Sequence, residues 1–555
     1  MSTRPLFSFF GGVHPPMHKD VSTGQPIDVM PLAERYILPL HQNIGQPAKP
    51  VVSVGERVLK GQRIGHAEGY VSVALHAPTS GTIADIGAYP VPHPSGLSDN
   101  CIVMTADGAD EWTECVALPD YENINPSHLR NIVREAGIVG LGGAGFPSFI
   151  KLNPGTHKKI DTLIMNGIEC EPYITCDDML MRERAAEIVA GIRIIRHALQ
   201  ANRVLIAIED NKPQAIKSIE EAIRGESAME VVACPTRYPQ GSEKQLVEAL
   251  TGKEIPSEAL PLHVGIVVHN VGTAAAVYRA IMLGEPLTSR IITVTGGGVA
   301  QPRNVEARIG TVIEDILAHC GGPTAETRKL IMGGPMMGFA LHSDRAPVVK
   351  TTNCLLAATA EEIPDRGPAL PCIRCGACSD ACPARLLPQQ LFWYAQAKDL
   401  DKIQEYNLFD CIECGCCAYV CPSNIPLVHY YRFAKTEIWA REREKEKAEL
   451  ARQRFDFRQT RLEREKAERA ARHKKKRDEL HSEEPSAAPA TETKKAAILA
   501  AMERAKKKKE AAGITPANTE ALTPQQQQMI EEVEQRRRQS RPNPEQQSAA
   551  SNGDK

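Results

Sequence analysis

Eight of the sixteen cysteines stand in two copies of one spacing pattern, Cys-x2-Cys-x2-Cys-x3-Cys-Pro. Each cysteine of the second copy lies 39 positions after its counterpart, so the segment is an internal duplication. In this pattern the first three thiolates hold three irons of a 4Fe-4S cubane, while the cysteine before the proline serves the other cluster. The spacing therefore predicts two crossed clusters, one on Cys372, Cys375, Cys378 and Cys421 and one on Cys411, Cys414, Cys417 and Cys382.

Zinc and disulfides explain these cysteines less well. A zinc site needs four ligands and leaves half of the eight thiols unused, and disulfides do not account for a duplicated spacing in a chain of this length. Cys416 interrupts the duplication, because its counterpart is Ala377. We expect Cys416 to be a bystander beside a cluster, since each cubane needs only four thiolates.

Length and charge indicate what surrounds the clusters. The chain has 555 residues, too many for one hydrophobic core, which predicts several domains. Residues 1–440 carry 38 basic and 47 acidic side chains, whereas residues 441–555 carry 28 basic and 21 acidic ones. The start has no signal-like apolar core, and no run of about 18 apolar residues occurs. We expect a cytosolic protein or one peripheral to a membrane.

Short β-rich runs broken by Gly and Pro occupy the region before residue 124. Residues 54–62 and 76–83 resemble the two hairpin halves of a lipoyl- or biotinyl-type sandwich, because their apolar positions alternate and their glycines suit tight turns. A carrier domain needs a lysine on the exposed turn, and residues 68–75 contain none. We therefore expect a structural domain and not a swinging arm.

An α/β pattern follows, with a helix expected from an N-cap at Ser127 and a buried strand at 204–208. Gly140 to Gly145 satisfy G-x-G-x-x-G, but a helix is expected before them and Phe146-Pro147 follows, which is the wrong context for a Rossmann fingerprint. An ordinary tight loop and a backbone surface for a flat or phosphorylated ligand both remain open.

Two carboxylates follow a predicted strand further along. Asn166, Glu169 and Glu171 come directly after the mostly apolar run 160–165. The end of a parallel strand beside a glycine loop is a common ligand crevice in α/β folds. A ligand site and a pair of solvated loop acids are both compatible with this segment.

Four segments together carry a specific resemblance. They are Gly-Gly-Ala-Gly-Phe-Pro at 142–147, Asn-x-x-Glu-x-Glu-Pro at 166–172, Tyr-x-x-Gly-x-Glu at 238–243 and Val-x-Asn-Val at 268–271. This order is similar to that of the flavin- and NADH-binding subunit of respiratory complex I. With the sandwich before them and the double cysteine motif after them, residues 1–440 resemble the C subunits of Rnf complexes, the ion-translocating NADH:ferredoxin oxidoreductases of bacterial membranes.

The resemblance implies cofactors and their ligands. Noncovalent FMN is implied at Gly140, Gly142, Gly143, Lys151, Asn166, Glu169, Tyr238 and Asn270, and NADH at Phe146, Glu171 and Glu243. The chemistry agrees, since an aromatic face can hold a nicotinamide or adenine plane, a lysine a phosphate, and carboxylates ribose hydroxyls. The chain differs from the complex I protein at Leu141, Ile168 and Ser242, where that protein has an arginine and two acidic residues.

The expected fold is a multidomain α/β chain. An N-terminal extension at 1–27 precedes a lipoyl/biotinyl-like barrel sandwich at 28–124 and an α/β flavin-binding domain at 125–286. A β-grasp insert of the kind found in these relatives follows at 287–345, then a two-cluster ferredoxin-type helical domain at 354–440. The charged tail at 441–555 is expected to begin as a solvated helix and to be mostly disordered.

The expected function is that of an electron-input subunit. NADH passes a hydride to FMN, and single electrons leave through two 4Fe-4S clusters to a ferredoxin-like subunit beside integral membrane subunits, at the cytoplasmic face of the bacterial inner membrane. No nucleic-acid partner is expected, because the basic tail has few aromatics and no binding fold. A soluble flavin and iron-sulfur NADH oxidoreductase, a bare electron carrier and an assembly scaffold are the alternatives.

Overall fold

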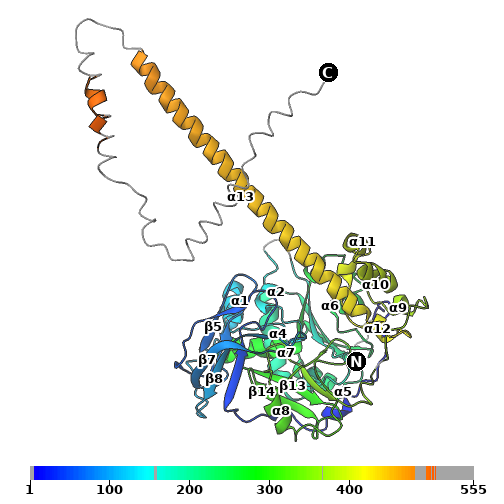
Figure 1. The fold of residues 1–555 in the computed structure, drawn as a ribbon. Coiled ribbons are helices and arrows are strands. Elements are labelled where there is room, and N and C mark those ends of the chain that lie inside the picture. The colour runs from blue at the N-terminus through cyan, green and yellow to red at the C-terminus, as the bar shows by residue number, and fades with distance from the viewer. Residues whose placement is uncertain are drawn as a thin grey trace. The chain divides into compact units, whose positions relative to one another are not determined.

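The computed structural model describes residues 6–155, 159–365, 367–481, 496–501, 503–504 and 507. The chain divides into two compact units, residues 1–446 and 447–555. The first unit holds every segment to which sequence analysis gave a cofactor (Figure 1). Its domains follow one another in chain order, from the blue sandwich to the yellow cysteine helices.

The sandwich consists of two small antiparallel sheets, ordered β2-β8-β7-β4 and β3-β5-β6. Its strands are β2 Arg35–Pro39, β3 Ala48–Pro50, β4 Arg57–Val58, β5 Arg63–Ala67, β6 Leu75–His76, β7 Gly81–Pro90 and β8 Ser98–Ala106. Strand β4 pairs with the start of β7, with Arg57 opposite Thr82. The two segments that sequence analysis treated as hairpin halves are therefore joined in one sheet.

The α/β domain is built on a four-stranded parallel sheet, ordered β11-β10-β9-β12. Its strands are β9 Thr162–Gly167, β10 Arg203–Glu209, β11 Met229–Cys234 and β12 Ile266–Asn270, and its helices are α1 Pro126–Glu135, α2 Ser148–Lys151, α3 Cys176–Glu183, α4 Ala185–Leu199, α5 Pro213–Ala222, α6 Glu243–Thr251 and α7 Val271–Tyr278. The short 3-10 helices η2 Tyr121–Asn123 and η3 Pro261–Val264 and the π-helix η4 Arg279–Leu283 complete it. The parallel sheet directs all four strand ends to one edge.

Two local features explain how this domain packs. Helix α1 begins slightly earlier than expected, because Asn125 and not Ser127 is its N-cap, and the Asn125 side chain accepts a hydrogen bond from Ser127 N. Helices α4 and α7 pack against each other. A Cβ added at Gly191 of α4 would lie 1.8 Å from Ala274 O of α7, so only glycine permits this approach.

A six-stranded mixed sheet, ordered β1-β14-β13-β17-β15-β16, forms the next domain. It comprises β1 Asp28–Val29, β13 Ser289–Thr295, β14 Arg303–Arg308, β15 Lys329–Met332, β16 Phe339–Ala340 and β17 Cys354–Ala358, with helix α8 Ile313–His319. Two expected boundaries differ here. Strand β1 pairs with β14 and not with the sandwich, and β17, which begins at Cys354, pairs with β13 and not with the cysteine motifs.

The cysteine domain repeats its backbone as well as its sequence. Its helices are α9 Ala377–Asp380, α10 Pro388–Ala397, α11 Leu400–Glu405, α12 Cys416–Tyr419 and the start of α13 Leu427–His481, with turn η5 Leu408–Asp410. Each copy has a positive-φ residue between its first two cysteines (Arg374, Glu413), a positive-φ glycine before a four-residue helix (Gly376, Gly415) and another positive-φ residue before the longer helix (Arg385, Asn424). The duplication is therefore structural.

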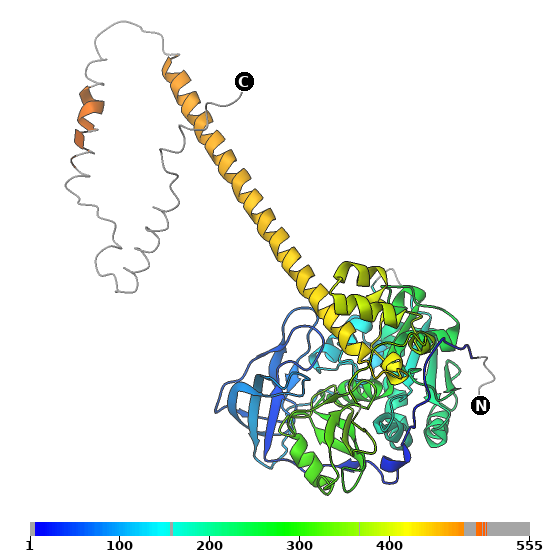
Figure 2. The same cartoon turned by 45° about the vertical axis from the view of Figure 1, so that its right-hand side comes forward.

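The N-terminal extension is not free. Its described residues run past the cysteine helices to the turn η1 Asp20–Ser22, as the dark-blue trace in Figure 2 shows. Gly12 N donates to Ala381 O of the cysteine domain, and Val13 forms a bridge with Tyr238 of the α/β domain. The extension thus contacts both the cysteine domain and the α/β domain.

In the second unit, the part of α13 after Glu446 carries mostly exposed side chains, with pairs such as Arg461–Glu465 and Arg464–Glu468 one turn apart. Residues 496–501 are also helical. The expected disorder of the remaining tail concerns positions outside the described residues. Among the helices of the described ranges, each is too short or too polar to cross a lipid bilayer.

Candidate functional site

The eight motif cysteines gather in two sets of four. Cys372, Cys375, Cys378 and Cys421 line one cavity, and Cys382, Cys411, Cys414 and Cys417 line another. Each cavity takes three cysteines from one copy of the motif and one from the other, which is the crossed arrangement that the spacing predicts. Four thiols around one cavity are the donor set that a 4Fe-4S cubane needs, so the residues present suit two such clusters.

Burial makes four of the motif thiols, on Cys378, Cys382, Cys411 and Cys417, poor acids without a metal. Burial raises the pKa of Cys411 to about 11 and also raises the pKa values of Cys378 and Cys382. Iron binding therefore has to replace the protons of the thiols with metal charge. Cys416 is fully buried beside Cys414, and its hydrogen bond to Cys414 is the main reason that the pKa of Cys416 is raised.

The two cysteine sets differ in their surroundings. The set around Cys414 packs against the α/β domain, because Tyr238 Oη donates to Cys414 O over 2.7 Å and Gln245 Nε2 donates to Pro383 O. In the other set Cys375 is exposed, and the neighbouring Ile373 side chain is 68% exposed. One cavity therefore adjoins the α/β domain and the other lies nearer the surface of the first unit.

The glycine loop is closed by its own backbone. Val139 and Pro147 form a bridge, Gly140 N donates to Phe146 O, and Gly145 N donates to Gly140 O. Gly142, Gly143 and Ala144 at the tip are exposed, and Gly143 has φ +105°. The loop lies between α1 and α2, so its context differs from that of a Rossmann fingerprint, as expected. Its exposed backbone can approach a planar ligand closely.

Two strand ends meet the glycine loop. Asn166 at the end of β9 is in register with Asn270 at the end of β12. A Cβ added at Gly142 would lie 3.6 Å from the Asn270 side chain, so the loop tip packs beside this edge. Asn166 Nδ2 donates to Gly241 O over 2.9 Å. All four motif segments therefore converge at the carboxyl ends of parallel strands, where α/β sheets hold ligands. We call this place, formed by Asn166, Asn270 and the glycine loop, the ligand edge.

Lys151 and Glu243 lie together at the same edge. Lys151 Nζ is 2.7 Å from Glu243 Oε1 and 3.2 Å from Val268 O. Both side chains are about one-third exposed, at 32% and 37%. The ion pair is thus accessible enough for either group to exchange its partner for a ligand phosphate or hydroxyl. Phe146 is half-buried at the end of the glycine loop.

The Glu169 carboxylate already has hydrogen-bond and charge partners within the protein. It accepts hydrogen bonds from the amides of Asp177 and Asp178 at the start of α3, and it pairs with the buried Lys212 at 3.1 Å. Burial alone would raise the pKa of Glu169, but Lys212 and then Lys19 together lower it. Glu169 therefore anchors the helix behind the ligand edge.

Glu171 and Tyr238 also have polar atoms that the fold already uses. Glu171 Oε1 accepts hydrogen bonds from Met336 N at 2.6 Å and Met337 N at 3.1 Å, and Tyr238 donates to Cys414 O. The polar side-chain atoms of Glu169, Glu171 and Tyr238, for which FMN or NADH contacts were expected, thus have partners within the protein. Of the remaining expected residues, Asn166 and Asn270 lie at strand ends, Lys151 ends α2, Glu243 begins α6, and the others belong to the glycine loop.

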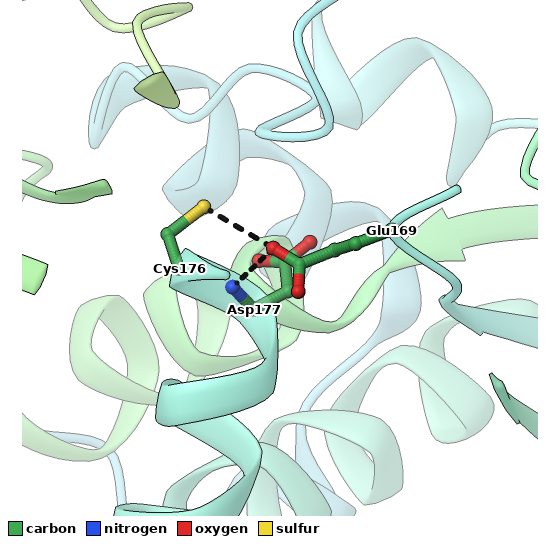
Figure 3. A group of neighbouring side chains, drawn as sticks. All are labelled: Glu169, Cys176 and Asp177. Carbon is green, nitrogen blue, oxygen red and sulfur yellow. Dashed lines mark hydrogen bonds between the residues drawn. The ribbon is translucent and has the colours of Figure 1, made fainter. Parts of the chain in front are cut away.

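Figure 3 shows a compact group of Glu169, Cys176 and Asp177, whose ligand atoms lie within 4.8 Å of one another. Asp177 N and Cys176 Sγ both donate to Glu169 Oε1, which leaves that oxygen occupied. Burial raises the pKa of Cys176 well above its usual value, so this thiol stays protonated. We assign no metal to this group.

Sequence analysis missed several buried charges around the site. Asn270 Nδ2 donates to Asp177 Oδ2 over 2.6 Å, and burial raises the pKa of Asp177 to about 7. Arg290 of β13 is buried and donates to Leu141 O in the glycine loop. The acidic pair at 177–178 could have been noticed because it follows the Glu-x-Glu segment, whereas Arg290 carries no local signal.

Four known domain families match segments of the first unit. The chain matches the RnfC barrel sandwich hybrid domain at residues 7–109, the Nuo51 FMN-binding domain at 133–279, the SLBB domain at 291–340 and a 4Fe-4S dicluster domain at 371–425. These matches confirm the expected multidomain α/β fold. FMN and 4Fe-4S clusters are the cofactors of the matched domains, as predicted.

Whole proteins match over most of the chain. The chain is 52% identical over 84% of its length to a protein of Pseudomonas aeruginosa, 49% over 87% to one of Erwinia tasmaniensis and 48% over 84% to one of Salmonella arizonae, each named as the C subunit of an ion-translocating oxidoreductase complex. It spans 60% of the length of the first two relatives and 69% of the third. The chain therefore belongs to the family of C subunits of ion-translocating oxidoreductase complexes, the Rnf-type family that its motifs resemble.

Proposed function

We propose that this chain is the electron-input subunit of an ion-translocating oxidoreductase complex, in which it oxidises NADH and delivers single electrons to a ferredoxin-like partner subunit. The observation that carries the proposal is the junction of its two cofactor-bearing domains. The Tyr-x-x-Gly-x-Glu segment contributes Gly241 to the ligand edge and Tyr238 to the carbonyl of Cys414. One short segment thus touches both ends of an electron path.

FMN would supply the conversion of a two-electron hydride into single electrons. For that task the chain offers the exposed backbone of Gly142 and Gly143, the amides of Asn166 and Asn270, and the Lys151 ammonium. The amides can donate to and accept from a flavin ring, and the ammonium can meet its phosphate. A buried Glu169 behind this edge holds α3 in place and need not touch the ligand.

NADH would lie over the flavin at the end of the glycine loop. Phe146 offers a half-buried aromatic face there, and Glu243 can accept from ribose hydroxyls when Lys151 turns to the phosphate. Such an exchange of partners is inexpensive, because a surface ion pair of this exposure contributes only about 0–1 kcal/mol. No general acid or base is required for hydride transfer to a flavin.

The surroundings of the two cysteine sets give the path a direction within the chain. We infer that the cluster on Cys382, Cys411, Cys414 and Cys417 receives electrons first, because it adjoins the α/β domain. The cluster near the exposed Cys375 would then pass them to the partner. Docking of that partner, and of membrane subunits at the cytoplasmic face, would place this chain at the periphery of the complex.

Anaerobic spectroscopy of the full chain tests the proposal. The purified protein, reconstituted with iron, sulfide and FMN and freed of unbound flavin, should keep FMN absorbance and about eight irons per chain. NADH should bleach both the flavin and the iron-sulfur bands. If flavin is not retained, or NADH leaves the cluster bands unchanged while dithionite bleaches them, the chain is a carrier and not an entry point. Recovery of the intact protein with washed membranes tests assembly, since a soluble oxidoreductase would stay in the supernatant.

A further inference from the structure

The N-terminal extension carries a lysine that the proposed reaction does not use. Lys19 is half-buried, and its Nζ donates to three backbone carbonyls: Glu169 O at 2.7 Å, Glu171 O at 2.7 Å and Ile174 O at 2.6 Å. An ammonium group has three hydrogens, so every donor is satisfied. All three acceptors belong to one loop, residues 169–174, which connects the ligand edge at Asn166 with helix α3.

The N-terminal extension contacts the same loop at a second place. Tyr173 N donates to Met17 O over 2.8 Å, and the Tyr173 ring stacks on His18 with centroids 4.7 Å apart. Tyr173 has φ +70°, which a non-glycine residue adopts only when its surroundings enforce it. Residues 17–19 therefore fix the loop in a backbone conformation that it would not keep alone.

The other end of the extension contacts the cysteine domain. Gly12 N donates to Ala381 O, one residue before the ligand Cys382. A Cβ at Gly11 would lie 2.8 Å from Ala381 O and from the carbonyl of Cys382, so the two backbones are in direct contact. Val13 pairs with Tyr238, whose hydroxyl binds Cys414 O. The extended segment before η1 thus contacts loop 169–174, the junction of the two domains and a predicted cluster ligand.

The loop itself also contacts the cysteine domain indirectly. Glu171 accepts from the amides of Met336 and Met337, and a Cβ at Gly415 would lie 2.9 Å from Met336 O. Loop 169–174 therefore connects the ligand edge with the loop that carries Cys414. If this loop loosens, the ligand edge and the cysteine set on Cys382, Cys411, Cys414 and Cys417 lose a shared support.

We propose that residues 7–19 form a strap that holds the ligand edge and the cluster on Cys382, Cys411, Cys414 and Cys417 at one separation, and that Lys19 is its positioning residue. The proposal rests on the proposed function, because the step it serves is the transfer of one electron from reduced flavin, which is oxidised, to that cluster, which is reduced. The proton lost with oxidation of the flavin goes to solvent. Lys19 itself neither binds substrate nor transfers a proton.

Replacing Lys19 by Met keeps a long apolar side chain and removes all three donors. Amide hydrogen exchange of segment 168–176 should then become at least about tenfold faster, because charged hydrogen bonds that hold the loop closed are lost and local opening is governed by their energy. Lys19→Arg keeps the charge and donors and should restore protection in part. Lys60→Met is the matched control: it removes an ion-paired lysine whose partner Asp110 lies in the sandwich domain, and should leave this segment unchanged.

The functional readout separates two steps. In stopped-flow experiments the full-length Lys19→Met protein should bind FMN and show flavin bleaching by NADH at the wild-type rate, while cluster bleaching slows by about tenfold to a hundredfold, as expected for a small misplacement of reacting partners. Unchanged exchange in segment 168–176 would overturn the strap. Faster exchange with unchanged cluster reduction would overturn the positioning role. Failure of wild-type protein to bleach at all would instead refute the proposed function, and the exchange measurement would still decide whether the strap exists.

Discussion

Tyr238 and Cys414 lie 176 positions apart in sequence and are joined by a hydrogen bond of 2.7 Å from the tyrosine hydroxyl to the cysteine carbonyl. The tyrosine is 2% exposed, and burial raises its pKa, so the hydroxyl stays a donor throughout the working pH range. The bond connects a motif of the flavin-binding domain to a predicted iron ligand. It therefore serves the junction of the two domains.

Tyr238→Phe tests this junction with little change of shape. The substitution leaves Cys414 O without its buried donor, which costs about 1–3 kcal/mol. We expect both clusters and FMN to be retained, the thermal midpoint to fall and NADH-driven cluster reduction to slow, because the cysteine set and the ligand edge lose a direct tie. Iron content, flavin content and stopped-flow rates measure these effects. An unchanged midpoint together with unchanged rates would contradict the role of this bond.

The crossed cysteine sets predict that two equivalent substitutions each remove a different cluster. Cys382→Ser should remove the cluster otherwise held by the second motif, and Cys421→Ser should remove the one held by the first. Each variant should keep about four of about eight irons, with a different surviving electron paramagnetic resonance signal. Cys416→Ala is the control and should keep both clusters. If Cys382→Ser lost the signal that Cys372→Ser also loses, the crossed assignment would be wrong.

Sequence reasoning succeeded where a repeat or a strand end defines the geometry. The spacing of Cys372 to Cys421 predicted which thiols share a cavity, because both copies of the motif repeat the same backbone turns. The apolar run before Asn166 likewise predicted a strand end at the ligand edge. Both features are local, so a single sequence contains them.

Contacts made by backbone or by very short strands could not be predicted. Lys19 binds three carbonyls about 150 positions away, and carbonyls carry no side-chain signal. Strand β1 has only two residues and pairs with β14 across 277 positions. The ion pair between Glu169, which the resemblance assigned to the flavin, and the buried Lys212 likewise has no signal in the sequence. Tertiary packing alone decides these contacts.

We expect the tip of the glycine loop to be needed for binding FMN and not only for folding. Gly143→Ala places a methyl group on the exposed face of the loop at φ +105°, and Gly155→Ala places one at φ +85°, where no described atom lies within 4 Å. Each change costs roughly 1 kcal/mol or more of backbone strain. We expect Gly143→Ala to release FMN on gel filtration, as measured by flavin fluorescence, and Gly155→Ala to keep it. Equal retention by both variants would place the flavin elsewhere.

Asp177 predicts a pH dependence of stability with a defined sign. Burial, and then Glu169, raise its folded-state pKa to about 7, whereas its pKa in the unfolded chain is about 3.9. Between these values the folded protein keeps a proton that the unfolded chain releases, so stability is lost as the pH rises through this window. The loss between about pH 5.5 and about pH 8 amounts to about 2 kcal/mol.

Asp177→Asn removes this titration and keeps an oxygen that can accept from Asn270. The thermal midpoint of the variant relative to the wild-type protein should therefore rise steadily from about pH 5.5 to about pH 8. Scanning calorimetry at matched ionic strength measures the difference, and Asp365→Asn, at an exposed carboxylate, is the control. Parallel pH profiles of the wild-type and Asp177→Asn proteins would show that Asp177 is already ionised at the acidic end of this range.

The long helix α13 predicts different results for two truncations. Its first turns belong to the cysteine domain, where Lys435 Nζ donates to Cys411 O and Tyr431 Oη donates to Pro388 O, both over 2.7 Å. A chain that ends at Glu446 keeps these bonds and the whole first unit. We expect it to retain FMN, about eight irons and NADH-driven bleaching.

A chain that ends at Pro426 loses all of α13 and with it the Lys435 and Tyr431 bonds. It should lose the cluster on Cys382, Cys411, Cys414 and Cys417, because the buried carbonyl of Cys411 and the cavity wall at Tyr431 are then exposed to water. Iron analysis and electron paramagnetic resonance of the two truncated proteins decide the point. Loss of iron from the chain ending at Glu446 would mean that the charged half of α13 supports the clusters. A scaffold role for the tail requires only that the chain ending at Glu446 bind its partner complex less tightly than the full chain does.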